Sequence, residues 1–363
     1  MAKLGEVCLL KAGKFVSAND ISPEYNKGLY PCFGGNGIRG YVADYTHDGE
    51  FPLIGRQGAL CGNVNLASGK FHATEHAVVV QPKIEMNVHW LYYALNAMNL
   101  GQYATGAAQP GLAVSKLETL SIEIPNISEQ NKIAQTLYKV EQLVNFRKQQ
   151  LAKLDELVKA RFVEMFGELH KTEYNIKTLD ELCEFIKDGT HQTPTYVDVT
   201  EGYKFLSSKD VTSGYIDWSS IKYISEELHQ ELYKRIAPQR GDILLAKNGT
   251  TGIPAIVETD ETFDIYVSLA LLRLKPNNNV RYIWSALRMP ETKAQFDNSL
   301  KGVGVPNLHL GEIKKTKIIV PPFSLQNQFS AFVERVDQQK QTVQQSLEKL
   351  ELMKKALMQE YFG

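Results

Sequence analysis

The sequence predicts an α/β fold made of two similar globular domains, each followed by a long helix. Three observations predict it. Residues 122–167 recur without a gap at 318–363, a globular type of segment precedes each copy, and apolar residues inside both copies are alternately three and four positions apart. A repeat of this length is too long for a solenoid unit, so it indicates a chain built from two halves.

Composition leaves room for two or three domains but gives little direct evidence of function. The 363 residues are 43% hydrophobic and 22% charged, and the net charge is −1. DNA binding would therefore have to rest on local clusters of residues and on motifs. The four cysteines, Cys8, Cys32, Cys61 and Cys183, have no metal-site spacing, and they are typical of a reducing compartment. We see no signal peptide and no apolar run near the roughly 18 residues of a membrane span, so we expect a cytoplasmic protein without a membrane partner.

The first globular segment, residues 1–121, alternates short strands with glycine-rich loops. The pattern predicts a glycine-dense stretch at 30–42, a short strand and a polar loop at 51–64, a buried strand at 76–82, a helix at 88–100, and a return through a loop to a strand at 106–125. The mixture of strands and a helix predicts a compact α/β domain.

The first copy of the repeat, residues 122–170, predicts a long helix, with Ser128 as its N-cap. The second copy, residues 318–363, keeps the same apolar spacing, and a helix of this length would be about 57 Å long. Polar residues interrupt both seams at different places: Arg147 and Arg161 in one, Lys340 and Lys354 in the other. We expect the two apolar stripes to pack against each other, with the polar positions setting their register. The alternative is that each stripe packs on its own globular segment.

The second globular segment, residues 171–317, is predicted to be a diverged copy of the first. Leu179–Cys183 matches Leu4–Cys8, and the later parts follow in the same order: 241–257 corresponds to 51–64, 267–276 to 76–82, 280–289 to 88–100, and 301–321 to 106–125. The helices have stayed similar while the loops have not.

No constellation of residues in the sequence predicts catalysis, a metal or a cofactor. Gly35–Gly40 has the spacing of a dinucleotide fingerprint, but Asp, Gly and Pro follow it where a helix would have to begin. Val320–Phe323 resembles the tetrapeptide of amino-methyltransferases, but its first residue is an apolar valine. The sequence has no phosphate-binding loop motif, no clustered carboxylates, and no histidines at metal-ligand spacing.

The loops therefore carry the candidate binding residues. Arginine recognises guanine edges, asparagine and glutamine recognise adenine, and lysine contacts phosphate, so these residue types suit DNA. For any single residue the alternative is a solvated turn, but the same kind of loop occurs in both halves. The candidates in the first half are Asn36, Arg39, Arg56, Gln57 and Asn63. Those in the second half are Thr190, His191, Gln192, Thr193, Ser207, Ser208, Lys209, Lys247, Asn248, Thr250, Lys301, Asn307, His309, Lys314 and Lys315.

Several motifs, in a specific order, carry a resemblance to a known family. Each long helix follows a strand, a proline, a serine and a Gln-Asn pair, and each ends in Phe-Gly; Asp188–Pro194, Gly241–Gly249 and the two glycine-rich stretches at 30–42 and 53–64 add to this pattern. Over its whole length the chain resembles the specificity subunit of type I restriction-modification systems. It differs from the longest members, which carry an extension before the first recognition domain.

The resemblance implies two target recognition domains, 1–121 and 171–317, each reading one half of a split DNA sequence. The helices at 122–170 and 318–363 would pair antiparallel about a pseudo-two-fold axis and act as a spacer. The subunit itself would be non-catalytic and would need no cofactor. It would bind double-stranded DNA and two modification subunits, which carry S-adenosylmethionine and methylate adenine, and through them restriction subunits that cleave DNA and use ATP. The candidate docking residues are Gln130, Asn131, Gln326 and Asn327.

Three other functions remain open at the level of sequence. The chain could serve a methylation-only system, with no restriction subunit. It could be a standalone methyltransferase or nuclease fused to a coiled coil, which the missing motifs disfavour. It could also be a coiled-coil adaptor without a DNA role, although two domains rich in loops are more than a tether requires.

Overall fold

The computed structural model describes residues 1–106, 110–300 and 306–363, and it divides the chain into two compact units. Unit 1 comprises Met1–Gln150 and Val343–Gly363, and unit 2 comprises Leu151–Thr342. The two long helices, α4 (Ile127–Phe166) and α10 (Phe323–Phe362), each contribute one part to unit 1 and the other part to unit 2.

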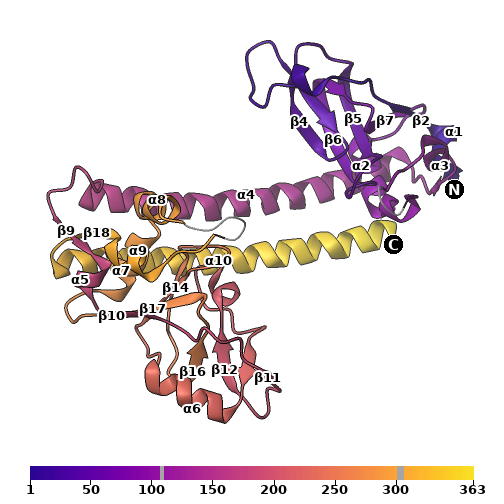
Figure 1. Cartoon of the computed structure of the whole chain (residues 1–363). Coiled ribbons are helices and arrows are strands. Elements are labelled where there is room, and N and C mark those ends of the chain that lie inside the picture. The colour runs from indigo at the N-terminus through magenta and orange to yellow at the C-terminus, as the bar shows by residue number, and fades with distance from the viewer. Residues whose placement is uncertain (107–109, 301–305) are drawn as a thin grey trace. The chain divides into compact units, whose positions relative to one another are not determined.

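Unit 1 is built on a six-stranded sheet with the order β2-β7-β5-β6-β3-β4. All neighbouring strands are antiparallel except β3 and β6, which are parallel. The strands lie side by side in Figure 1, with α2 at the end of the sheet nearest α4. The elements are β1 (Ala2–Lys3), α1 (Leu4–Val7), β2 (Cys8–Ala12), η1 (Ala18–Asp20), β3 (Tyr30–Gly34), β4 (Gly37–Val42), β5 (His47–Gly55), β6 (Val64–Ala73), β7 (Ala77–Pro82), α2 (Val88–Ala97), η2 (Leu100–Tyr103), α3 (Val114–Glu118) and β8 (Ser121–Ile122).

Helix α2 forms the centre of the main core of unit 1. Its apolar spacing places Trp90 and Tyr93 on one face, where both are fully buried. Ile133 and Leu137 of α4 complete the same core, and Phe362 of α10 packs against it. The first globular domain and its long helix therefore share one hydrophobic core.

Unit 2 contains two four-stranded sheets, with the orders β10-β17-β14-β15 and β11-β13-β12-β16, and a two-stranded pair, β9 with β18. Its elements are β9 (Asn175–Thr178), α5 (Leu179–Leu182), β10 (Cys183–Asp188), β11 (Tyr196–Val197), β12 (Tyr203–Leu206), η3 (Ser208–Val211), β13 (Lys222–Ile224), α6 (Glu226–Arg235), β14 (Ile243–Ala246), β15 (Pro254–Ile256), β16 (Phe263–Ile265), β17 (Leu269–Leu274), α7 (Val280–Leu287), α8 (Pro290–Asn298), α9 (Leu310–Lys315) and β18 (Lys317–Val320).

The structure confirms that the two halves are copies of one α/β design. The order β10-β17-β14-β15 in unit 2 repeats β2-β7-β5-β6 in unit 1, with antiparallel pairing throughout. A parallel contact between β12 and β16 likewise repeats that between β3 and β6. A β-bulge between Cys183 and Phe185 inserts one residue into β10, so the two copies run out of step by one position from there.

Helices α4 and α10 pair antiparallel, because positions further along α4 contact positions earlier in α10. In unit 1, Lys354 Nζ lies 2.7 Å from Glu141 Oε1, and in unit 2 Lys340 Nζ lies 2.7 Å from Asp155 Oδ1. Arg147 donates across the pair to Ser346 Oγ at 3.1 Å. Three of the four polar seam residues thus link the helices, whereas Arg161 donates to Glu164 of its own helix at 2.8 Å.

The apolar stripes serve both of the roles that the sequence left open. Val144, Val343 and Leu347 are buried in the helix pair. By contrast, Phe329 and Val333 belong to the core of the second globular domain. The helices therefore pair with each other near the middle of their sequences and join the domain cores towards the ends of the seam.

The start of α4 differs from the expected one. The helix begins at Ile127, and Asn126 Oδ1 accepts a hydrogen bond from the Glu129 amide at 3.0 Å. Ser128 therefore lies inside the first turn and is not the N-cap. Asparagine is as good a capping residue as serine, so the helix is capped by Asn126, two positions earlier than predicted.

A buried glutamine fixes each globular domain to its long helix. Gln326 Nε2 donates to Pro321 O and its Oε1 accepts from the Asn279 amide, both at 2.9 Å. Gln130 makes the same two bonds, to Pro125 O at 2.8 Å and from the Asn87 amide at 2.9 Å. Asn87 and Asn279 in turn cap α2 and α7.

These contacts change the prediction for subunit docking. Gln130 and Gln326 are only 2% and 1% exposed, and both ends of each amide are bonded within the chain. Their side chains therefore do not offer a docking surface, because their hydrogen bonds hold the domain to the helix. Asn131 and Asn327 are exposed, and docking through them stays a prediction.

Replacing Gln326 with leucine is expected to lower the free energy of unfolding of unit 2 by about 2–3 kcal/mol. The buried Asn279 amide and Pro321 carbonyl would each lose their partner, and an unsatisfied buried group costs about 1–3 kcal/mol. Urea denaturation followed by tryptophan fluorescence would measure the change. Ser324→Ala, at an exposed position of the same first turn, is the control. Equal midpoints for the two variants would contradict the proposed role of the glutamine.

No helix in the described part of the chain is long and apolar enough to span a membrane. The four cysteines are all buried free thiols, as the absence of paired spacing predicts. Burial raises the pKa of Cys8 to about 11 and that of Cys183 to about 12, which disfavours the reactive thiolate at neutral pH.

Candidate nucleic-acid interface

In unit 2, four segments meet at one place, which we call the loop junction of that unit. Backbone hydrogen bonds tie the end of β10 to the segment before β17, since Thr190 N donates to Ile265 O at 3.2 Å. The end of β14 joins the same segment through Lys247 N and Ser268 O, at 2.8 Å. The loop before α9 follows, with Leu308 N donating to Lys247 O at 2.8 Å.

Unit 1 has a loop junction with the same backbone bonds. Lys14 N donates to Ala73 O at 2.8 Å, Arg56 N to His76 O at 3.0 Å, and Leu112 N to Arg56 O at 2.8 Å. A single bridge between Gln57 and Gly111 also repeats that between Asn248 and Asn307. Arg56 and Gln57 therefore occupy the positions that Lys247 and Asn248 occupy in unit 2.

One glycine in each junction allows this close approach. A Cβ atom on Gly13 would lie 2.0 Å from Ala73 O, and one on Gly189 would lie 1.9 Å from Ile265 O. No side chain fits such a distance, so both positions require glycine. Ala12 then stands where Asp188 stands, directly before the glycine.

An ion-pair cluster holds the junction of unit 2. Lys247 Nζ lies 2.7 Å from Asp188 Oδ2, and the two residues are only 5% and 7% exposed. Arg235 Nη2 lies 3.4 Å from the other oxygen of Asp188, and His191 Nε2 lies 3.5 Å from Oδ2. The single carboxylate of Asp188 thus lies close to Lys247 at the end of β14, to Arg235 of α6 and to His191 of its own loop.

Helix α6 brings Arg235 to this cluster, and a buried pair positions the helix. His229 Nδ1 lies 2.6 Å from Asp264 Oδ2, and the His229 ring stacks on Tyr203 with ring centroids 3.8 Å apart. Burial raises the pKa of Asp264 to about 6, although the hydrogen bond from His229 acts in the opposite direction. This pair attaches α6 to β16.

The junction of unit 2 borders a cavity of about 650 Å³. Five predicted residues line it, together with Asp188: His191, Lys247, Asn248, Asn307 and His309. They come from three separate parts of the sequence, and the structure brings them together. Thr190 lies beside them with its side chain buried, accepting a hydrogen bond from the Gln192 amide.

Three more predicted residues of unit 2 gather at a second cavity, of about 370 Å³. Ser207, Ser208 and Lys209 line it beside Tyr266. Thr193 Oγ1 lies 3.2 Å from the Tyr266 hydroxyl, which connects the Asp188–Pro194 segment to this cavity. The segment before β17 therefore separates two groups of candidate residues.

Other predicted residues of unit 2 lie apart. Lys314 pairs with Asp180 at 3.2 Å, and Lys315 pairs with Glu312 of its own helix at 3.4 Å. Gln192 and Thr250 are exposed on loops without lining either cavity. Lys301 lies outside the described residues.

In unit 1 the structure groups most of the predicted residues. Asn63 Nδ2 donates to Asn36 Oδ1 at 2.8 Å. The loop that carries Asn36 lies against the end of β5, where Arg56 and Gln57 follow. Arg39 is exposed on the neighbouring strand β4. Gly35–Gly40 forms the turn between β3 and β4 and the start of β4, not the start of a helix, as the sequence predicts.

Among the polar side-chain atoms that are buried without a hydrogen-bond partner in the described part of the chain are Arg56 Nε and Asn307 Oδ1, together with Thr74 Oγ1 and Glu75 Oε2 of the same unit 1 junction. Buried polar groups are normally hydrogen-bonded, so each such atom needs an explanation. The arginine and the asparagine, one in each unit, are the two that the sequence predicts to contact DNA.

Sequence reasoning missed three residues of the junctions. Asp188 belongs to the Asp188–Pro194 motif, but nothing in that motif predicts its ion pair with Lys247. No sequence pattern points to Arg235, because it is the last residue of helix α6 and lies far in sequence from the Asp188–Pro194 motif. Gly13 was hidden by the extra residue in β10, since a gapless alignment from Cys8 and Cys183 pairs it with Asp188 and not with Gly189.

The arrangement presents hydrogen-bonding side chains on the loops of both units. Among the residues that the structure describes, no group of three or more histidine, cysteine or acidic side chains could hold a metal ion. The fold and the sites define a class of protein in which two related domains present variable polar loops and share a pair of antiparallel helices.

Comparison with known proteins identifies the family. The model of the type I restriction modification DNA specificity domain matches residues 1–156 and 171–352. The type I restriction enzyme EcoprrI specificity subunit of Escherichia coli is 53% identical over 143 residues, 39% of this chain and 36% of that protein. A protein of Haemophilus influenzae described as a type I restriction enzyme specificity subunit is 25% identical over 325 residues, 85% of this chain and 80% of that protein.

A solved structure has the same fold. The S subunit of the type I restriction-modification system from M. genitalium matches 99% of this chain and 95% of its own, with a TM-score of 0.61 and 18% identity. The chain therefore belongs to the type I restriction-modification specificity subunits, a family of DNA-binding, non-catalytic subunits.

Proposed function

We propose that each loop junction reads one half of a bipartite DNA target. The observation that carries the proposal is the repeated junction: identical backbone bonds in both units display different side chains. Arg56 and Gln57 in unit 1, and Asn248, Asn307 and His309 in unit 2, are of the types that bind base edges. The unpartnered Arg56 Nε and Asn307 Oδ1 would find their hydrogen-bond partners on the DNA.

Helices α4 and α10 serve as the spacer between the two readers in this proposal. Each is 40 residues long, or about 60 Å. That is enough to hold two DNA-reading domains about one duplex turn apart, ~34 Å, or somewhat more. The cross-helix bonds of Arg147, Lys340 and Lys354 would fix the register.

The helices also offer surfaces for modification subunits. Helix α4 leaves five large apolar side chains exposed: Tyr138, Leu143, Phe146, Leu157 and Val163. Exposed apolar surface of this kind marks interaction sites. Asn131 lines a cavity of about 510 Å³ with His89 and Tyr138. This concave surface supports the predicted docking role of Asn131. The modification subunits would bring S-adenosylmethionine, and restriction subunits would assemble through them.

Exchanging residues 171–317 for the corresponding domain of another family member tests the reading model. We expect one half of the methylated target to change and the other half to stay, because unit 1 is untouched. Sequencing of methylated adenines in cells that express the chimaera with its modification subunit gives the result. The reverse exchange, of residues 1–121, should change the other half. An unchanged target in both chimaeras would refute the assignment of one half-site to each domain.

The competing classes are separated by a simpler assay. The purified chain with S-adenosylmethionine and DNA should transfer no methyl group, and transfer should appear when a modification subunit is added. Transfer by the chain alone would favour a standalone enzyme. Assembly without DNA binding would favour an adaptor, and methylation without cleavage in the complete system would favour a methylation-only function.

A further inference from the structure

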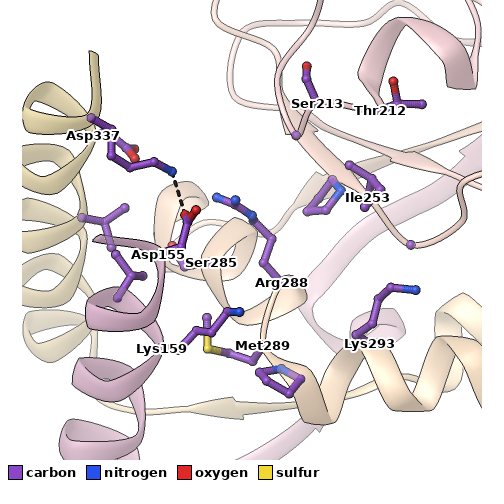
Figure 2. A pocket seen from close by; sticks show the side chains of 17 residues that line it. Asp155, Lys159, Thr212, Ser213, Ile253, Ser285, Arg288, Met289, Lys293 and Asp337 are labelled. Carbon is purple, nitrogen blue, oxygen red and sulfur yellow. Dashed lines mark hydrogen bonds and ion pairs between the residues drawn. The ribbon is translucent and has the colours of Figure 1, made fainter. Parts of the chain in front are cut away.

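Unit 2 contains a cavity of about 410 Å³ away from its loop junction. Helices α4, α7, α8 and α10 border it, together with the loops after η3 and before β15 (Figure 2). Its walls include the apolar side chains of Val158, Ile253, Met289 and Val333. Charged and hydroxyl side chains line much of the rest of it, and a volume in this range is typical of sites for small organic groups.

The repeat explains how the cavity arose. In unit 1, Tyr93 of α2 donates to Glu141 Oε2 at 2.8 Å, and Lys354 lies 2.7 Å from the other oxygen. Asp337 is the counterpart of Glu141, since the long helices align without gaps.

The two partners of that carboxylate have smaller counterparts in unit 2. Alignment of the caps Asn87 and Asn279 places Ser285 where unit 1 has Tyr93, and Val158 replaces Lys354. Ser285 bonds back to Arg281 O at 2.7 Å and does not reach Asp337. Two large side chains are thus replaced by small ones in unit 2, and both of the small side chains line the cavity.

The charges around the cavity favour an anion. Its lining carries four cations, Lys159, Arg288, Lys293 and Lys340, and two carboxylates, Asp155 and Asp337. Both carboxylates are already neutralised. Asp155 pairs with Lys340 at 2.7 Å, and Asp337 lies 3.2 Å from Arg281 Nη1 and accepts from the Tyr215 hydroxyl at 3.4 Å. Lys293 is also paired, with Asp297 at 2.6 Å.

Arg288 and Lys159 are left without a carboxylate partner among the residues that the structure describes. Arg288 lies over the Trp284 ring, with its guanidinium carbon 4.3 Å from the ring centroid. Stacking of this kind holds the planar group in place while its N–H groups stay free. Figure 2 shows Arg288 and Lys159 reaching into the same space, with the apolar Ile253 and Met289 beside it.

We propose that this cavity binds an organic carboxylate with an apolar body. The carboxylate lies against Arg288, which can hold two oxygens at once, and against Lys159. The apolar body fills the volume that Tyr93 occupies in unit 1. The carboxylate belongs either to a free small molecule or to a side chain or C-terminus of an assembled partner subunit. In this proposal unit 2 has the site, whereas the side chains of Tyr93 and Lys354 fill the corresponding space in unit 1.

Titration calorimetry of the full chain with 3-phenylpropanoate tests the site, with the neutral amide of the same compound as the matched probe. We expect saturable binding of the acid and at least tenfold weaker binding of the amide. Arg288→Gln should weaken binding of the acid at least tenfold. Arg335→Gln, an exposed arginine of α10 outside the cavity, should change it less than twofold.

A variant that fills the cavity provides a second, independent test. Ser285→Tyr restores the residue of unit 1, so it should abolish binding while the circular dichroism spectrum and the unfolding midpoint are kept. No saturable binding of the acid, equal binding of acid and amide, or full affinity in Arg288→Gln would each overturn the proposal. None of these three results depends on whether Ser285→Tyr folds.

Titration of the chain assembled with its modification subunits then separates the two sources. Binding to both the free chain and the assembly supports a free carboxylate as the natural ligand. Binding to the free chain with at least tenfold loss in the assembly supports a carboxylate from the partner in the same site.

Discussion

An Asp188→Ala variant is expected to lose about 3–5 kcal/mol of the free energy of unfolding of unit 2. Asp188 is the carboxylate that neutralises Lys247, and both are buried. Removing one member of a buried ion pair leaves an uncompensated charge, and that charge accounts for most of the cost. Urea denaturation followed by tryptophan fluorescence is suitable, because Trp218 and Trp284 both belong to unit 2.

Two control variants make the interpretation specific. The double variant Asp188→Leu with Lys247→Met removes both charges and should recover most of the lost stability, since apolar replacement of a buried pair is often neutral. Glu312→Ala removes the exposed pair with Lys315 and should cost less than about 1 kcal/mol. If Asp188→Ala behaved like Glu312→Ala, the cluster would not be holding the junction together.

Shortening both long helices by one heptad is expected to shorten the gap in the DNA target by about three base pairs. Deleting residues 144–150 together with 345–351 removes facing parts of α4 and α10 and keeps the pairs of Glu141 with Lys354 and of Asp155 with Lys340. Seven residues span about 10 Å of helix, and a duplex turn of 34 Å holds about 10 base pairs. Sequencing of methylated adenines would show the new spacing.

The matched control is duplication of the same two segments, which should lengthen the gap by a similar amount. In both variants the two half-site sequences should stay as they are, because the recognition domains are unchanged. Retention of the original gap by both variants, with methylation intact, would rule out the helices as the spacer.

The main features of the fold were predictable because they follow from repetition and periodicity. A gapless repeat and an apolar seam require two long helices, and burying two seams requires a partner for each. The strands at β5 and β7 and the helix α2 followed from short apolar runs and helical spacing. Ser128 shows the limit at helix ends, since Asn126 and Ser128, two positions apart, differ little in free energy as caps.

The candidate sites were predictable only in part, because they depend on contacts between distant segments. The side-chain types of Asn248, Asn307 and His309 make each of them a candidate for DNA contact, but nothing in the sequence shows that the three share a cavity. The bulge in β10 hid the equivalence of Gly13 and Gly189. Arg235 could be found only once α6 was placed. Contacts of the predicted residues with DNA remain predictions.

The backbone construction of the loop junctions has a consequence for how such proteins change over evolutionary time. The bonds that join the four segments run between main-chain atoms, so apart from Gly13 and Gly189 they make no demand on side-chain identity. Substitutions at positions such as Gln57 or Asn248 are therefore expected to change the side chains that the junction presents while leaving the main-chain bonds that assemble it in place. The main-chain frame therefore tolerates change at exposed loop positions, whereas Lys247 and Asp188 are constrained by their buried ion pair as well.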